Sequence, residues 1–433
     1  MLSKEDNERL TQVGPGTPMG RFMREYWMPA LLSSELPRND SDPVRVVLLG
    51  ERLVAFRDST GKIGLIDHLC PHRGASLFFG RNEESGLRCV YHGWKFDVGG
   101  NCVDMPNEPP QSDFKHKVKA RAYPTVERNG LVWAYLGPRE TPPPLPDIPA
   151  NMIDGSELFA FMIDGNWLQI LEGDLDTTHA SFLHYGALRA EDQPEGTFSE
   201  YQLRNRNAYF EVIDTEGGSA YGARRPAAPG EEYWRIAQWC FPFYAFPPSG
   251  VLGIKQNGMC RVPMDDTHTM YFRMFVDIRT GAGADPSRPK LLPNTTDWYG
   301  RFRTEQNMGN DFLIDRDVQR RREGKTGYTG IPVVQMQDSA VQTSGGLIVD
   351  RSRERLGSTD AMVIRIRRRL LSALRAYEEQ GVTPPGVDTP EAYQVRSGGV
   401  ALPEGSDWVE STRDLRHAFT EVKGLDPALN GPL

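Results

Sequence analysis

The stretch that decides the fold of the first third of the chain reads CPHRGASLFFGRNEESGLRCVYH over residues 70–92. Cys70 and His72 form a first pair in it, and Cys89 and His92 form a second pair after an interval of sixteen residues. Thiolates and imidazoles are metal ligands of soft to borderline character. We therefore expect two adjacent loops that bring these four ligands together.

Two thiolates and two imidazoles suit either a tetrahedral zinc ion or a Rieske-type [2Fe-2S] cluster, in which cysteines hold one iron and histidines the other. A zinc finger would need a CxxC pair and a separate pair of histidines. Here each cysteine is accompanied by its own histidine, and Gly74 and Gly93 mark loop bends between strand-like segments. The spacing favours the cluster, both over zinc and over four ordinary buried residues. Such a cluster relays electrons.

The surroundings of these loops predict an all-β domain. Residues 44–69 alternate β-branched and aromatic runs with turn signals, which is typical of an antiparallel meander, and further strands are expected around a turn at 98–101 and at 130–137. Six prolines between 138 and 149 predict an extended spacer, because proline donates no ladder hydrogen bond. These features predict an N-terminal segment over 1–26, a [2Fe-2S] domain over 27–140 and a second domain over 150–433.

The second domain has a mixed pattern, which predicts an α+β fold. Strand-like runs occupy 233–246 and 268–278, and apolar residues at helical spacing predict a long helix over 359–380. Stretches rich in glycine and proline predict loops over 279–296 and 383–405.

A second group of possible metal ligands lies in residues 166–186, which contain Asp176, His179 and His184. Two histidines and a distant carboxylate form the facial triad that leaves one side of Fe(II) open. A helix is predicted over 166–184, but on a regular helix His179 and His184 would point about 140° apart. We therefore expect a π-type distortion or a helix end between Ala180 and His184.

Composition excludes several other classes of protein. The net charge of -8 over 433 residues leaves no basic surface for nucleic acid, and the odd count of five cysteines argues against a disulfide framework. Cys102, Cys240 and Cys260 are expected in the core. We found no apolar run long enough for a membrane span and no secretion signal, so a cytoplasmic location is expected. The dinucleotide-binding pattern GxGxxG is also missing, so a reductase would be a separate protein.

The motifs at 70–75, 89–97 and 174–184 resemble, in order and spacing, those of the Rieske non-haem iron ring-hydroxylating oxygenases. Residues 10–36 and 314–360 are more narrowly similar to the α subunits of the phthalate 4,5-dioxygenase-like group. The resemblance covers nearly the whole chain. It implies a Rieske domain followed by a helix-grip (START-like) catalytic domain with an antiparallel sheet and helices, assembled as a trimer or as a hexamer made of two trimers.

The resemblance also implies roles for individual residues. Asp176 would be catalytic, bridging His92 of one subunit and His179 of the next. The third iron ligand would be Asp338, at the start of a helix, in preference to the other downstream acids Asp311, Asp315 and Asp317.

The implied activity uses O2 and electrons from a separate NADH-dependent reductase of the flavin and ferredoxin type. The substrate would be an aromatic carboxylate, such as a phthalate isomer or a substituted benzoate, and cis-dihydroxylation would be the expected reaction. Arg206 and Arg235 are candidates for binding the carboxylate, because guanidinium groups bind it through two hydrogen bonds. An apolar wall would come from Phe243 and its neighbours Phe210, Trp239 and Tyr244.

Two alternatives remain open at this stage. One is a Rieske monooxygenase that performs O- or N-demethylation, since a phthalate-type pair of carboxylate-binding arginines has no complete match in the sequence. The other is an electron carrier whose larger domain only binds a ligand.

Overall fold

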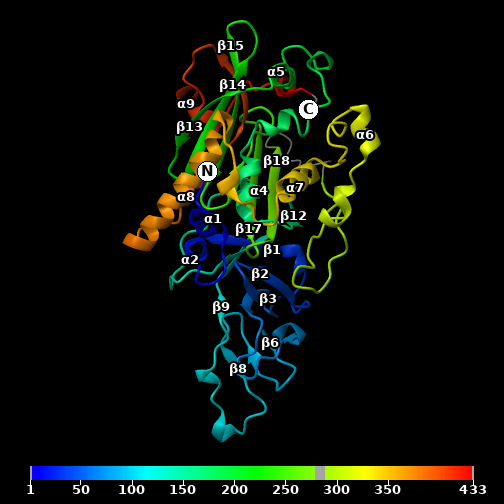
Figure 1. The fold of residues 1–433 in the computed structure, drawn as a ribbon. Coiled ribbons are helices and arrows are strands. Elements are labelled where there is room, and N and C mark those ends of the chain that lie inside the picture. Colours follow the sequence, from blue (N-terminus) through cyan, green and yellow to red (C-terminus); the bar gives the residue numbers. More distant parts are fainter. Residues whose placement is uncertain (1, 278–287, 432–433) are drawn as a thin grey trace.

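The computed structural model describes residues 2–277 and 288–431. Within these residues, three small antiparallel sheets form the part of the chain over 27–135, and one large antiparallel sheet dominates the part that follows (Figure 1). Positions 278–287 lie outside the described residues; they include the last residue of the strand predicted over 268–278 and part of the loop predicted over 279–296.

The domain predicted over 27–140 is built from strands and short 3-10 turns, so its all-β class is confirmed. Its strands are short and pair antiparallel, and the meander expected over 44–69 forms the centre of one sheet. The three sheets consist of β1 (Trp27–Leu32), β11 (Leu131–Tyr135) and β10 (Thr125–Arg128); β2 (Val44–Leu48), β3 (Glu51–Arg57), β4 (Ile63–Asp67) and β9 (Ala122–Tyr123); and β5 (Arg81–Glu83), β6 (Gly86–Arg88), β7 (Lys95–Phe96) and β8 (Cys102–Asp104).

The large sheet is also antiparallel and follows the chain order closely. Strands β13 to β18 are neighbours in sequence order, while β12 closes the sheet beside β18 and β19 pairs with β15. The strands are β12 (Glu157–Ile163), β13 (Tyr209–Asp214), β14 (Gly218–Pro226), β15 (Glu231–Cys240), β16 (Tyr244–Phe246), β17 (Lys255–Pro263), β18 (Thr269–Asp277) and β19 (Gly398–Pro403). The predicted α+β class with an antiparallel sheet is therefore confirmed.

Helices cover this sheet. The long helix α8 (Ala361–Gln380) packs on β13 and β14, close to the bounds predicted from its apolar spacing, and Gly381 ends it in the left-handed conformation at φ 65°. Helix α4 (Trp167–Asp174) packs on β16 and β17, and α7 (Val334–Ser344) packs on α4. The shorter helices are α3 (Pro149–Met152), α5 (Phe198–Arg204), α6 (Arg316–Arg321), α9 (Trp408–Ser411) and α10 (Arg413–Arg416).

The two N-terminal helices belong with this second part of the molecule. Helix α1 (Lys4–Thr11) packs on α4 and α8, and α2 (Pro18–Arg24) packs on α8 (Figure 1). Each has a side-chain cap at its first turn, since Ser3 accepts from Asp6 N and Thr17 accepts from Gly20 N. The chain therefore begins beside the large sheet, continues through the three small sheets and then returns to the large sheet.

The loop predicted over 383–405 is partly wrong, because it contains β19. Its glycines allow backbone segments to approach closely: a Cβ added at Gly398 would lie 2.6 Å from Cα of Leu252, and one at Gly399 would lie 2.8 Å from the ring of Tyr233. Glycine here allows close packing against β15 and against the segment before β17, and its frequency was misinterpreted as a loop signal.

In the part of the chain that the structure describes, every helix is too short or too polar to cross a bilayer.

Candidate active site

Two loops with the same hydrogen-bond pattern carry the cysteine and histidine pairs. In each loop the cysteine N–H donates to the carbonyl five residues later, at 2.8 Å from both Cys70 and Cys89. The glycine four residues after each cysteine donates back to the cysteine carbonyl, at 2.9 Å from both Gly74 and Gly93. These glycines have φ of 70° and 78°, a region that other residues rarely adopt. The repeated geometry presents two equivalent ligand pairs.

The four side chains converge as two thiols and two imidazoles. Cys70 and Cys89 are buried, and burial raises the pKa of Cys70 to about 11 in the absence of a metal. The rings of His72 and His92 lie 4.4 Å apart, and Nδ1 of His92 is buried with no hydrogen-bond partner in the described part of the chain. Paired thiols and paired imidazoles, with a ring nitrogen left for coordination, fit a [2Fe-2S] cluster held by one pair at each iron.

The segment with the other two histidines is less helical than predicted. Helix α4 ends at Asp174, so Asp176 lies outside it, and only a short 3-10 turn (His179–Ser181) follows. The expected distortion is present, because Tyr185 N donates to the carbonyl of Ala180 at 3.0 Å, a hydrogen bond that spans five residues. The helix predicted through residue 184 is therefore wrong in length. The side chain of Asp176 takes a backbone N–H group that a continuing helix would use, because its carboxylate accepts from Thr178 N at 2.8 Å.

This irregular backbone brings His179 and His184 to one point beside Asp338 of α7. Their Nε2 atoms are 3.2 Å apart, and Oδ1 of Asp338 lies 3.4 Å from the first and 3.2 Å from the second. A point equidistant from atoms with these separations lies about 1.9 Å from each, close to metal–ligand bond lengths of ~2.0–2.2 Å. The three donors therefore fit a mononuclear metal ion.

The electrostatics of this triad favour a cation. Burial alone would lower the pKa of His179, but the carboxylates of Asp176 and Asp338 raise it to about 10. Burial would likewise raise the pKa of Asp338, yet the two imidazoles hold it well below its usual range. A metal ion would supply the positive charge that these groups stabilise.

Gln337 orients one of the two histidines. Its Nε2 donates to the carbonyl of Ile331 at 2.8 Å, so its Oε1, 2.8 Å from Nδ1 of His184, must accept. Nδ1 of His184 then carries the proton, and Nε2 keeps its lone pair for the metal. Asp176 faces the other histidine, with Oδ2 at 3.6 Å from Nδ1 of His179.

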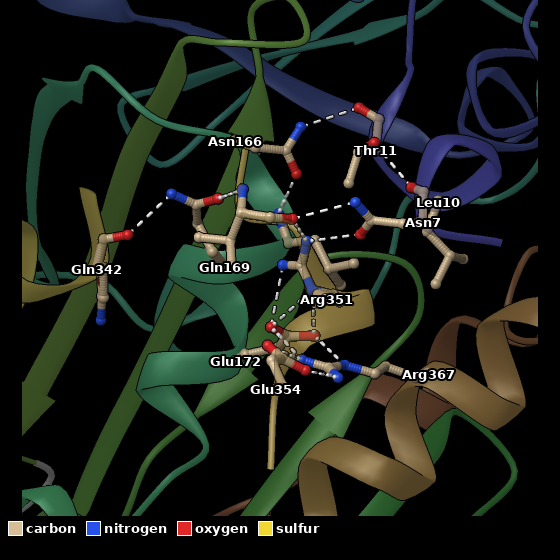
Figure 2. Close-up of polar contacts among 12 residues, drawn as sticks. Asn7, Leu10, Thr11, Asn166, Gln169, Glu172, Gln342, Arg351, Glu354 and Arg367 are labelled. Carbon is tan, nitrogen blue, oxygen red and sulfur yellow. Dashed lines mark hydrogen bonds and ion pairs between the residues drawn. The ribbon is translucent and has the colours of Figure 1, made fainter. Parts of the chain in front are cut away.

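Polar contacts tie α4, which precedes the two histidines, to α7, which carries Asp338 (Figure 2). Gln169 of α4 donates to the carbonyls of Gln342 at 2.8 Å and Gly346 at 3.0 Å, and accepts from Val349 N at 3.0 Å. These bonds connect α4 to the C-terminal end of α7. The helix preceding the histidines is thereby held against the helix that supplies the carboxylate.

Glu172 of α4 is the centre of a second buried network (Figure 2). It accepts from Arg351 at 3.0 Å and from Arg367 of α8 at 2.6 Å, and Arg351 also donates to Asn7 of α1 at 3.1 Å. Arg367 pairs further with Glu354. Both arginines are at most 4% exposed, so these are buried charges that depend on the carboxylates.

A cavity of about 480 Å³ adjoins the triad. Alternate residues of two neighbouring strands face it, which reflects the period of two along a strand. From β17 these include Met259 and Arg261, and from β18 Tyr271 and Arg273; Phe161 of β12 adds an apolar wall.

Comparisons with known proteins decide the family. The model of the Rieske [2Fe-2S] domain matches residues 26–124, and the model described as "LigXa C-terminal domain like" matches residues 134–427. The chain belongs to the Rieske non-haem iron oxygenases. Its cofactors are accordingly a [2Fe-2S] cluster and a mononuclear iron, and both sets of residues described above fit them.

Individual relatives extend along nearly the whole oxygenase. It is 45% identical to the 3-chlorobenzoate-3,4-dioxygenase oxygenase subunit of Comamonas testosteroni, over 94% of this chain and 97% of the relative. It is 39% identical to the phthalate 4,5-dioxygenase oxygenase subunit of Pseudomonas putida, over 87% of both. It is 33% identical to the 5,5'-dehydrodivanillate O-demethylase oxygenase subunit of Sphingobium sp. (strain NBRC 103272 / SYK-6), over 86% and 80%.

Solved structures share the fold at lower identity. Dicamba monooxygenase bound to dicamba superposes with a TM-score of 0.55 at 20% identity, covering 83% of the oxygenase and 99% of that chain. Pseudomonas putida CBB5 NdmA superposes with a TM-score of 0.53 at 18% identity, covering 93% and 99%.

The predicted substrate residues of the oxygenase divide into two groups. Arg235 lines the cavity, where its Nε donates to Thr177 at 2.8 Å and its Nη1 donates to Gln202 at 2.6 Å. Arg206 lies outside the cavity lining, because its guanidinium donates to the carbonyls of Ser181 and Leu188 and so braces the histidine segment.

Phe243 is also outside the lining, since its side chain is completely buried in the main hydrophobic core. Trp239 and Tyr244 are buried in the same core, and Phe210 packs against it. The apolar wall predicted from these four residues is therefore misplaced, because a strand-like aromatic run fills the core as readily as it lines a cavity.

The alternative acids for the iron also lie elsewhere. Asp315 caps α6 by accepting from Asp317 N at 2.8 Å, and Asp317 pairs with Arg320 on the surface. Asp311 is not part of the group of possible metal ligands formed by His179, His184 and Asp338.

Three residues near the site were missed in the sequence. Gln337 directly precedes Asp338, and this adjacency was an available signal for a helper residue. Arg261 and Asp174 form an ion pair although they lie 87 positions apart in the chain. The sequence around each residue contains no signal for this pair.

Proposed function

We propose that this chain is the oxygenase component of a multicomponent Rieske system that hydroxylates an aromatic carboxylate. It would use O2 and electrons from a separate NADH-dependent reductase of the flavin and ferredoxin type, and cis-dihydroxylation of a phthalate isomer or substituted benzoate is the proposed reaction. When bound, the cluster supplies single electrons and the iron supplies activation of dioxygen.

The proposed substrate class rests on the contacts that Arg235 makes. This guanidinium lines the cavity beside the triad, yet among the described residues its hydrogen-bond partners, Thr177 and Gln202, are uncharged and it forms no ion pair. Arg235 is partly buried, and withdrawing a charge from water without a counterion is costly, so an anion in the cavity would be stabilised. Aromatic walls such as Phe161 and Tyr271 suit a benzene ring. A benzene ring with a carboxylate satisfies both features.

Two relatives are named for substrates of this class, chlorobenzoate and phthalate, which supports the proposal. A third is named as an O-demethylase of an aromatic compound. Demethylation by a monooxygenase is therefore the second candidate for the reaction at the same site.

We propose that Asp176 mediates electron transfer between subunits. Its carboxylate would bridge His179 and the partner subunit's His92. Its Oδ1 is fixed by the backbone and hydroxyl of Thr178 at 2.8 and 2.6 Å, whereas Oδ2 faces His179 and the side chain remains 29% exposed. Exposure at this point leaves Oδ2 accessible to a second imidazole. A carboxylate between two metal-bound imidazoles orients both rings and shortens the electron path.

The arrangement within one chain fits transfer between subunits. In Figure 1 the small sheets with β6 and β8 occupy the narrow lower end of the molecule, whereas α4 and α7 lie in the broad upper part. A head-to-tail trimer, or a pair of trimers, would bring the cluster loops of one chain to the triad of its neighbour.

Oxygen uptake by the reconstituted protein with a compatible reductase and NADH tests the proposal. We expect uptake that depends on an aromatic carboxylate and is coupled to NADH oxidation. Oxygen-18 gas distinguishes the two reactions, because a dioxygenase inserts two labelled atoms and a demethylase one. Failure of every aromatic acid to stimulate uptake would contradict the proposal. A metal content of two irons per chain in place of three would indicate an electron carrier.

A further inference from the structure

The geometry points to a cavity with two different polar ends. We infer that Arg235 binds the carboxylate of the substrate, while the ion pair of Arg261 and Asp174 binds an uncharged hydrogen-bond acceptor on the same ring. The preferred substrate is then a benzoate with a hydroxyl or alkoxy substituent, and a benzene dicarboxylate is disfavoured. This inference rests on the proposed function and narrows its substrate class.

Arg261 is a cavity residue with unused hydrogen-bond donors. It lies on β17, its side chain is 2% exposed, and the ring of Tyr271 lies 3.5 Å from its guanidinium carbon. Its Nη2 pairs with Asp174, but Nε and Nη1 are buried and have no hydrogen-bond partner among the residues that the structure describes. Buried donors without partners are rare in folded proteins, and a ligand that accepts from them relieves this deficit.

Asp174 determines which acceptor fits. It ends α4, and its carboxylate neutralises Arg261, so the pair has almost no net charge. A second carboxylate placed at the open donors of Arg261 would approach that of Asp174 in a buried region, where like charges repel strongly. A hydroxyl or alkoxy oxygen accepts the same hydrogen bonds without repulsion.

Charge balance supports one carboxylate. Arg235 is partly buried and carries a charge that no carboxylate among the described residues balances, whereas Asp174 balances the charge of Arg261. Lys325 also lines the cavity but is exposed, so water and salt screen its charge. Lys255 and Arg273 line the cavity as well, and both lie over the ring of Phe275.

The first experiment measures wild-type holoenzyme with reductase. The substrates are benzoate, its 3- and 4-hydroxy and methoxy derivatives, isophthalate and terephthalate. We expect kcat/KM for the best hydroxy or methoxy derivative to exceed that of benzoate and of both dicarboxylates by about tenfold or more, because an unmatched polar group in the site penalises the wrong ligand. Anaerobic calorimetry should give the same order of binding. Preference for a dicarboxylate would overturn the inference.

The second experiment changes the neutralising charge. Asp174→Asn should raise the ratio of kcat/KM for isophthalate to that for 3-hydroxybenzoate by about tenfold, because Arg261 then carries an unbalanced charge. The ratio within one variant is independent of how much protein is active. Asp214→Asn on β13, outside the cavity, is the matched control and should leave the ratio unchanged. An unchanged ratio in Asp174→Asn would contradict the inference.

A double variant controls for misfolding of the single variant. Asp174→Asn with Arg261→Gln removes both charges together, and the advantage of hydroxybenzoate over benzoate should then disappear. Arg235→Gln should weaken all the acids alike. If wild type neither binds nor oxidises any aromatic acid, the proposed function fails; if it oxidises benzoates but these ratios do not change, only the two-ended cavity is wrong.

Discussion

The amide oxygen of Gln337 lies 2.8 Å from Nδ1 of His184, while Nε2 of the same imidazole faces Asp338 at 3.2 Å. The amide nitrogen is committed to the carbonyl of Ile331, so the oxygen can only accept. One ring nitrogen is therefore protonated and the other is left for iron. Outer partners of this kind commonly change metal affinity when they are removed.

Gln337→Leu should weaken iron binding by about 10–100-fold, because His184 loses the partner that fixes its tautomer. Competition with a chelator, followed by iron analysis, measures the effect. Gln337→Glu keeps an acceptor and should retain iron more tightly than the leucine variant. Equal iron retention by both variants would show that the amide has no role in orienting His184.

Asp338→Ala should abolish the mononuclear iron and leave the cluster intact, because the triad loses its carboxylate while the cluster loops are on a separate domain. Visible absorption reports the cluster, and metal analysis reports the single iron. Asp315→Ala is the control: it removes the cap of α6 and should leave three irons in place. Loss of both centres in Asp338→Ala would indicate general misfolding.

Asp176→Asn should keep both metals and lower turnover by about 100-fold or more, since an amide cannot accept from two imidazoles as a carboxylate does. Rapid mixing of the reduced protein with substrate and oxygen should show slow reoxidation of the cluster. Turnover at the wild-type rate would refute the bridge.

Glu172→Gln should destabilise the protein by about 3–5 kcal/mol, because two buried guanidinium groups lose their shared carboxylate. Urea unfolding monitored by fluorescence measures it. Glu378→Gln removes a carboxylate from a more exposed group of charges with Arg9 and Arg21, and should cost about 1 kcal/mol or less. Similar losses in the two variants would contradict the central role of Glu172.

Alanine substitutions at Gly74 and Gly93 of the cluster loops distinguish backbone strain from a steric clash of the added methyl group. Gly74→Ala adds only the strain of a positive φ, about 1–2 kcal/mol, because its Cβ would meet no atom of the described residues within 4 Å. Gly93→Ala adds the same strain and places Cβ at 2.7 Å from the ring of Pro106. Cluster content after purification should therefore fall further in the second variant than in the first.

The sequence predicted those parts of the site whose ligands are close along the chain. The paired cysteines and histidines, and Asp176 with His179 and His184, were identified by spacing. Asp338 needed the family resemblance, since its role depends on α7 packing against α4. Arg261 could not be predicted, because its significance arises from Asp174, 87 positions away.

The fold showed the same division between local and tertiary signals. Apolar spacing located α8, and alternation located the meander of the first domain. The prediction from sequence pattern was wrong at β19, where Gly398 and Gly399 allow close packing and do not mark a loop. It also failed past Asp174, where the Asp176 side chain binds the backbone that a helix would need.

The packing of α1 bears on the construction of chimaeric oxygenases. Asn7 donates to Val349 and accepts from Arg351, so the first helix is part of the framework that supports α4, although it precedes the cluster domain in the chain. Exchanging everything upstream of residue 140 between two relatives would divide that framework. A graft that starts after α2 and ends before the proline-rich spacer would keep this framework within one parent.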